Sequence, residues 1–173
     1  MTTQDTPLPG PAEQTIDERD GLYLRRAIAL ADLARERGNR PFGCVIVAAD
    51  GQVLAEDHNR NGETGDCTAH AEVQALRTAT PRHPREALAA ATLYASGEPC
   101  VMCAGAIFWS NIRRVVFGID AVRLRHFRGE RLDQRDAELS CRDVFAAAPT
   151  PIECLGPALL SEARTSHEGG WKP

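Results

Sequence analysis

Two short motifs, His70-Ala71-Glu72 and Pro99-Cys100-Val101-Met102-Cys103, restrict what this chain can fold into more than any other feature. Together they supply one imidazole, two thiols and one further carboxylate. Zinc in proteins is usually tetrahedral, and a structural site fills all four positions with side chains, whereas a catalytic site leaves one position to water. The ligand set His70, Cys100 and Cys103 therefore predicts one catalytic zinc ion per chain.

Glu72 is the predicted catalytic proton shuttle. It is too close to His70 along the chain to be a convenient second ligand, yet near enough to take a proton from the metal's water. Two thiolates offset most of the metal's charge and leave that water less acidic than three neutral histidines would, so a general base is needed. The chemistry predicted is hydrolytic deamination, in which water attacks the amine-bearing carbon of an amidine-like ring and ammonia leaves.

Each motif alone has simpler explanations. A Cys-x-x-Cys pair is commonly half of a structural zinc site or a redox pair, and His-x-Glu occurs by chance. In this order, with Pro99 directly before the first cysteine, the motifs match the signature of zinc deaminases. A redox pair would leave His70 and Glu72 without a role. A non-catalytic, zinc-stabilised interaction module is a further alternative, and it would tolerate the loss of Glu72.

The chain resembles the cytidine deaminase-like superfamily, in the branch of guanine deaminase, fungal cytosine deaminase and bacterial tRNA adenosine deaminase. The matching blocks follow in the family's order over roughly residues 20 to 120, and they are Pro41 to Val47, His58-Asn59-Arg60, Thr68 to Glu72, Glu98 to Ile107 and Arg114 to Gly118. The resemblance implies an α/β fold, with three α/β/α layers around a five-stranded mixed sheet. It also implies zinc at the ends of two central helices and a homodimer.

The resemblance extends to substrate-binding residues. It implies that Asn59 hydrogen-bonds the substrate ring, with an ordinary turn residue as the alternative. Phe42 and Trp109 are similar to aromatic residues that enclose a planar ring in guanine deaminases, with core packing as the alternative. Trp171 is a predicted lid, because relatives often close the pocket with C-terminal aromatic residues; a loosely held tail is the alternative.

Length and composition predict one domain. The 173 residues, 43% of them hydrophobic, suffice for a single α/β domain over residues 19–173, after a flexible polar leader over residues 1–18. Six cysteines, two of them assigned to metal, indicate a reducing, cytoplasmic compartment. No apolar stretch approaches the roughly 18 to 20 residues that span a bilayer, so we expect no membrane partner.

Net charge bears on the substrate. Nucleic-acid binding normally needs a basic face, and this chain has a net charge of −4. The predicted partner is therefore a small-molecule nucleobase or nucleoside, guanine-type or cytosine-type, with the wobble adenosine of a tRNA as the main alternative. The arginines at 113, 114 and 123 to 135 could form a basic stripe, but a solvated helix face explains them better.

Periodicity and turn residues predict the elements. The pattern predicts helices over 19–37, from 70 onward, over 100–110 and over 159–163, and strands over 42–49, 52–57, 91–96, 114–119 and 152–155. Asp50-Gly51 is a hairpin turn signal between the first two strands. Thr68 is the predicted N-cap of the second helix, and Pro99 suits the first turn of the third.

Overall fold

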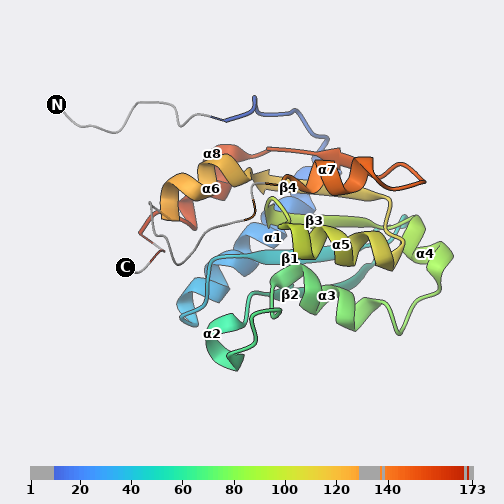
Figure 1. The fold of residues 1–173 in the computed structure, drawn as a ribbon, viewed down its shortest axis with the longest axis horizontal. Coiled ribbons are helices and arrows are strands. Elements are labelled where there is room, and N and C mark those ends of the chain that lie inside the picture. The colour runs from blue at the N-terminus through green and yellow to red at the C-terminus, as the bar shows by residue number, and fades with distance from the viewer. Residues whose placement is uncertain (1–9, 129–136, 138, 170, 172–173) are drawn as a thin grey trace.

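A five-stranded mixed sheet forms the centre of the computed structural model, which describes residues 10–128, 137, 139–169 and 171 (Figure 1). The strands lie in the order β2-β1-β3-β4-β5. Their bounds are β1 Gly43–Val47, β2 Val53–His58, β3 Thr92–Gly97, β4 Arg114–Ile119 and β5 Glu153–Leu155. β1 pairs antiparallel with β2 and β3, while β4 pairs parallel with β3 and β5.

Both faces of the sheet are buried under helices. In β1, Cys44 and Ile46 belong to one apolar cluster, and Val45 and Val47 belong to the other. This alternation follows from the two-residue period of a strand, and it explains why β1 is an unbroken apolar run rather than an alternating one.

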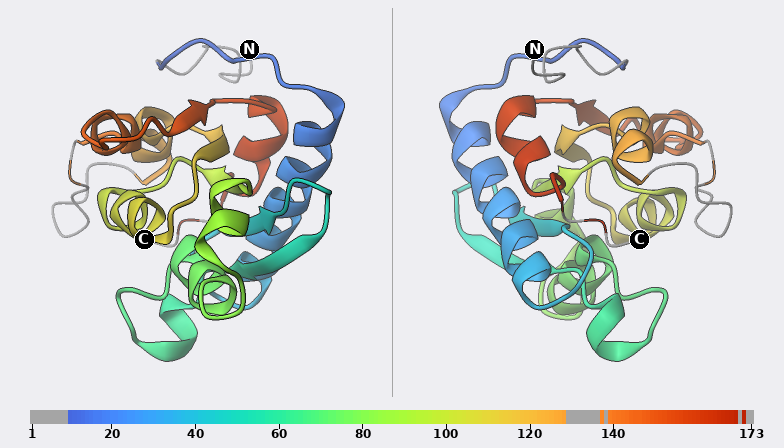
Figure 2. Two further views of the ribbon diagram at one scale, coloured as in Figure 1. Left: turned by 90° about the vertical axis from the view of Figure 1, so that its right-hand side faces the viewer. Right: turned by 90° about the vertical axis from the view of Figure 1, so that its left-hand side faces the viewer.

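Two helical layers cover these faces (Figure 2). The first cluster packs the sheet against α3, α5 and α7, and the second packs it against α1, α6 and α8. The helices are α1 Glu18–Glu36, α2 Asn61–Thr64, α3 Ala71–Ala79, α4 Arg85–Ala89, α5 Val101–Ser110, α6 Ala121–Arg128, α7 Cys141–Ala146 and α8 Leu160–Thr165. The predicted three-layer α/β/α architecture is therefore confirmed.

Two predicted helix starts are wrong in detail. The N-cap of α3 is His70 rather than Thr68, whose hydroxyl donates to Asp66 Oδ1 instead (2.7 Å). The N-cap of α5 is Cys100, which places Pro99 before the helix rather than inside its first turn. Neither N-cap makes a side-chain cap hydrogen bond, so both side chains are available for another partner.

The segment before α1 lies against the chain between β5 and α8. Gln14 Oε1 accepts from the Gly156 amide (2.6 Å), and Glu13 Oε1 accepts from the Leu160 amide (2.9 Å). The division into a leader over 1–18 and a domain over 19–173 stays a prediction. Residues 129–136, which hold part of the arginine-rich stretch, lie outside the described residues. Within the described part, no helix is both long and apolar enough to cross a bilayer.

Candidate metal centre

The predicted ligands meet where two helices begin. His70 is the N-cap of α3, and Cys100 is the N-cap of α5, three residues before Cys103 in the same first turn. A helix N-terminus carries partial positive charge and unpaired amides, and it therefore favours a thiolate over a thiol. The end of β3 delivers the chain to α5, so the sheet itself positions the two cysteines.

The three donor atoms have the spacing of a tetrahedral zinc site. Cys100 Sγ lies 3.6 Å from Cys103 Sγ, and His70 Nδ1 lies 3.6 Å from Cys100 Sγ and 3.5 Å from Cys103 Sγ. Zinc bonds of about 2.3 Å to sulfur and about 2.0 Å to nitrogen, at tetrahedral angles, require separations of about 3.8 Å and about 3.5 Å. The side chains fit the ion without rearrangement.

Glu72 lies beside the ligands without joining them. Its Oε2 is 3.5 Å from Cys103 Sγ, and among the residues that the structure describes the group of possible ligand atoms within 4.8 Å of one another consists of His70, Cys100 and Cys103. The residue is 5% exposed, and burial, reinforced by the charge of the Cys100 thiolate, raises the pKa of the Glu72 carboxyl to about 7. A carboxyl with this pKa can both accept and release a proton near neutral pH.

Of the two cysteine ligands, Cys100 has thiolate character. The hydrogen bond shared with Cys103 is the main cause that lowers the pKa of the Cys100 thiol to about 4, and His70 contributes further. The same pairing with Cys100 raises the pKa of His70. A site that stabilises a thiolate in this way is prepared for a cation, because zinc binds the deprotonated sulfur.

Glu98 braces the loop that carries Cys100. Its Oε1 accepts from the Ser140 hydroxyl (2.6 Å), and its Oε2 accepts from the Ala121 amide (2.8 Å). One carboxylate thus ties the metal loop to the starts of α6 and α7. Outer partners of this kind fix the orientation of metal ligands.

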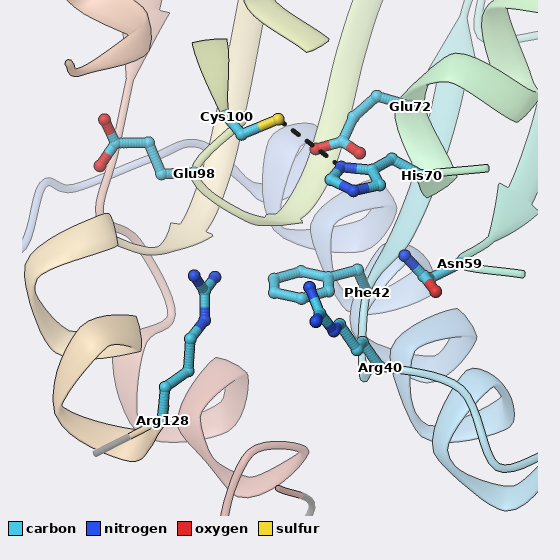
Figure 3. A pocket seen from close by; sticks show the side chains of 8 residues that line it. All are labelled: Arg40, Phe42, Asn59, His70, Glu72, Glu98, Cys100 and Arg128. Atoms are coloured by element: carbon cyan, nitrogen blue, oxygen red, sulfur yellow. Dashed lines mark hydrogen bonds between the residues drawn. The ribbon is translucent and has the colours of Figure 1, made fainter. Parts of the chain in front are cut away.

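A cavity of about 60 Å³ opens beside the ligands (Figure 3). It is lined by side chains from five separate parts of the chain, namely Arg40, Phe42, Asn59, His70, Glu72, Glu98, Cys100 and Arg128. Figure 3 shows Asn59 and Phe42 on the side opposite Glu98, with His70 and Glu72 between them and Cys100. The cavity therefore joins the metal ligands to an aromatic surface and to polar groups of both charges.

Asn59 is buried and held by a neighbour. It is 1% exposed, its Nδ2 donates to Asn61 Oδ1 (2.7 Å), and its Oδ1 accepts from the Asn61 amide (3.1 Å). A carboxamide has two donor hydrogens and two acceptor lone pairs. Each end of Asn59 therefore keeps one further hydrogen bond for a ligand, and its orientation is fixed in advance.

An aromatic cluster backs the cavity at Phe42. The Phe42 ring lies 5.3 Å from the ring of His167 and 5.9 Å from that of Trp171, and these two stack at 5.8 Å. The Arg128 guanidinium lies 5.0 Å from the Trp171 ring. The C-terminal segment thereby reaches the wall of the cavity through Phe42 and Arg128.

Trp109 lies elsewhere. It is 78% exposed, and it is not among the residues that line the cavity. At about 100° per residue along a helix, Trp109 is rotated about 240° from Cys103, which explains why it faces outward while Cys103 faces the site. The structure brings Phe42 and Asn59 to the cavity and Trp171 to its wall, but not Trp109.

Sequence reasoning missed four residues near the site. Arg40, Glu98 and Arg128 line the cavity, and His167 supports Phe42. Glu98 directly precedes the Pro99-Cys100 motif, so its position was a usable signal. Arg40, Arg128 and His167 carry no local signal, because folding alone brings them near the ligands.

The family comparison matches the region that carries the site. A family profile described as the cytidine and deoxycytidylate deaminase zinc-binding region matches residues 17–119. A "Probable cytosine deaminase" of Schizosaccharomyces pombe is 42% identical over 161 residues, covering 90% of this chain and 94% of that protein. A "tRNA-specific adenosine deaminase" of Agrobacterium fabrum is 43% identical over 96 residues, but covers 56% of this chain and 62% of that protein.

Solved structures agree on the fold. A tRNA:A34 deaminase studied for A-to-I editing at the wobble position superposes with a TM-score of 0.63 at 30% identity, over 84% of this chain and 99% of that one. A guanine deaminase from Nitrosomonas europaea superposes with a TM-score of 0.72 over 98% of both chains. At 19% identity, the second match shows the fold alone.

Proposed function

The chain belongs to the cytidine and deoxycytidylate deaminase family, and from this premise we propose that it deaminates a small nucleobase or nucleoside, with cytosine as the first candidate. It is a zinc-dependent hydrolytic deaminase. The observation that carries the proposal is the near-equal spacing of 3.5 to 3.6 Å among the three donor atoms, with the buried Glu72 beside them. Cytosine comes first because the relative named for it matches almost the whole chain.

The residues of the site divide the chemistry among them. When held by His70, Cys100 and Cys103, zinc supplies a Lewis acid that makes water a stronger nucleophile. Glu72 takes a proton from the attacking water, passes it to the ring nitrogen, and then assists proton transfer to the amine. One water is consumed and one ammonia leaves, so the C–NH2 group becomes a carbonyl.

The cavity supports a small substrate. A volume of about 60 Å³ holds only a few water molecules, at 10 to 15 Å³ for each one, so a single ring fits better than a fused purine. Phe42 offers its aromatic face to that ring, and Asn59 offers its remaining donor and acceptor. We assign both residues to substrate binding and Trp171 to the closing of the pocket through its contact with Phe42.

Charge pairing argues against the tRNA alternative. Arg114 pairs with Asp20 (2.7 Å) and Glu153 (2.8 Å), and Arg123 pairs with Asp120. These arginines are therefore occupied within the protein, and the chain as a whole carries a net charge of −4. Binding to an RNA backbone needs several cations that are free to neutralise phosphates.

We further propose a homodimer in a reducing, cytoplasmic compartment. The outer face of α5 exposes Trp109 (78%) and Val101 (39%), and Phe108 packs edge-on against Trp109 (5.2 Å). An exposed apolar face on a short helix suits a contact with a second copy. The substrate-binding role expected for Trp109 requires such a copy, because Trp109 lies outside the cavity of its own chain. Light scattering should give twice the mass of the chain, and Trp109→Ser should lower it.

An ammonia-release assay tests the proposed function. The substrates are cytosine, guanine, adenine, their nucleosides and a tRNA anticodon hairpin, with zinc measured in parallel. We expect release from cytosine or its nucleoside; release from the hairpin alone would overturn the proposal.

The Glu72→Gln variant tests the mechanism. It should keep its zinc and lose about 10² to 10⁴ in kcat. The exposed Glu86→Gln is the matched control. Normal turnover of Glu72→Gln would contradict the mechanism.

A second comparison tests Asn59. Asn59→Ala should raise KM or depress kcat for the accepted substrate, while the midpoint of thermal unfolding changes little. Asn61→Ala is informative beside it, because it removes the side-chain acceptor of Asn59 Nδ2 and leaves in place the Asn61 backbone amide that donates to Asn59 Oδ1, without removing the ring contact itself. If Asn59 is only a turn residue, both variants will lose stability and keep their kinetic constants.

A further inference from the structure

Two guanidinium groups line the substrate cavity. Arg40 comes from the loop between α1 and β1, and Arg128 is the last residue of α6, so the fold brings them together from distant parts of the chain. Figure 3 shows both side chains extending toward Phe42, on the side of the cavity away from Cys100. Arg40 is exposed and Arg128 is half-buried, whereas Glu72 beside the metal ligands is buried, so the two arginines lie toward the mouth of the cavity and the ligands toward its inner end.

The carboxylates of the cavity do not neutralise Arg40. Glu72 lies against Cys103 at the inner end (3.5 Å). Glu98 accepts from the Ala121 amide and the Ser140 hydroxyl, one donor for each oxygen. Within the described part of the chain, the exposed Arg40 side chain makes no hydrogen bond or ion pair with a protein group. The mouth therefore carries positive charge in a protein that is acidic overall.

A neutral base would leave the positive charge of the two arginines without a partner. The zinc does not need that charge either, since its own double charge is offset by two thiolates. A guanidinium, by contrast, binds carboxylate and phosphate oxygens with two parallel hydrogen bonds, and it stays charged at all physiological pH values. The chemistry at the mouth is therefore complementary to an anionic oxygen group.

We propose that the substrate carries an anionic group, a phosphate or a carboxylate, that Arg40 binds at the mouth while the ring lies against Phe42. This inference rests on the proposed deaminase function and narrows its substrate class to anionic derivatives of the base. Arg128 lines the opposite side of the mouth, where its contact with the Trp171 ring fixes the position of its charge. Because the enclosed volume holds little more than one ring, the anionic group lies outside it, within reach of the exposed Arg40.

A small molecule is a better source of this anion than an RNA strand. One or two cations at a single opening can hold one phosphate or carboxylate, whereas an RNA backbone needs cations spaced along a surface. Arg114 and Arg123 cannot extend the site, since each is paired with a carboxylate of the protein.

Matched pairs of ligands test the proposal. We would measure dissociation constants on zinc-loaded Glu72→Gln protein, and kcat/KM on the active enzyme, for cytidine against cytidine 5′-monophosphate and for cytosine against cytosine 5-carboxylate. The anionic member of at least one pair should bind about tenfold more tightly. The pair that responds identifies the group as a phosphate or a carboxylate.

Variants of Arg40 locate the effect. Arg40→Gln should reduce the preference for the anionic member about tenfold, and Arg40→Lys, which keeps the charge, should restore part of it. The exposed Arg82→Gln, which lies outside the cavity, should leave the preference unchanged.

The outcomes separate this inference from the proposed function. Ammonia from a neutral base without any anionic preference, or an equal loss for both members in Arg40→Gln, would overturn the inference and leave the deaminase proposal intact. Binding of the anticodon hairpin alone, with affinity that falls steeply with salt, would overturn both the small-molecule substrate and the role of Arg40 in it. The absence of ammonia from every substrate would contradict the proposed function itself.

Discussion

His167 should make the folded protein lose stability in mild acid. Its ring is 1% exposed, packed between Phe42, Phe127 and Trp171, and neither ring nitrogen has a hydrogen-bond partner in the described structure. Burial lowers the pKa of His167 from 6.5 to about 3, and the charge of Arg128 adds to the effect. The neutral imidazole is therefore the form that fits the native state.

Proton linkage gives the direction and the size of this change in the free energy of unfolding with pH. Between pH 6.5 and about 3, the unfolded chain binds a proton at His167 that the folded chain does not, so the free energy of unfolding falls as the pH drops. This contribution is fully present above pH 6.5 and decreases by about 1.4 kcal/mol for each unit below it. At pH 4.5 the loss should be about 2.7 kcal/mol.

Urea unfolding of two proteins at several pH values measures this loss. His167→Phe keeps an aromatic ring against Trp171 but cannot titrate. Subtracting its free energy of unfolding from that of the wild type, between pH 7.5 and 4.5, cancels the contributions of carboxylates and metal ligands common to both. The difference should shift by about 2 to 3 kcal/mol against the wild type. His83→Phe, which replaces a partly exposed histidine outside this aromatic cluster, is the matched control variant. A wild-type minus His167→Phe difference that does not change with pH would refute the reasoning.

Three other predictions have defined outcomes. Gly43→Ala should cost about 1 to 3 kcal/mol in urea unfolding, because its Cβ would lie 2.2 Å from the Ala27 carbonyl oxygen of α1; a neutral result would show that α1 can move. Arg114→Ala should cost about 3 kcal/mol, because it leaves Asp20 buried without its cationic partner, whereas Arg25→Ala, which breaks an exposed pair, should cost much less; equal costs would contradict this distinction. Glu98→Ala should weaken zinc binding about 10- to 100-fold in competition with a chelator. Unchanged affinity would show that Glu98 does not help to position the loop that carries Cys100.

Local motifs explain how much of the fold and site was predictable. The ligands sit in two motifs of a few residues each, and they come together because each motif begins a helix. All five strands were predicted to within about two residues at each end, since each is a short apolar or alternating run bounded by turn residues. The short helices α2, α4 and α7 were missed, because segments of four to six residues show too little periodicity to be recognised.

Long-range packing explains what was missed. Arg40, Arg128 and His167 reach the site from the α1–β1 loop, the end of α6 and the C-terminal segment, respectively, and no spacing in the sequence connects them. Thr68 has the propensity of an N-cap, but Asp66 takes its hydroxyl and the helix begins at His70 instead. Contacts between residues outside the local pattern thus determined where α3 begins and which side chains reach the site.

The central position of β3 determines when the protein can first capture its ion. His70 precedes this strand and both cysteines follow it, so neither half of the polypeptide offers a tridentate chelate alone. The register requires β3 to be inserted between β1 and β4. A nascent chain therefore has no complete ligand set until synthesis has passed Cys103, and zinc uptake follows the placement of β3 beside β1. Fragments that end before Cys100 should leave the cellular zinc pool untouched.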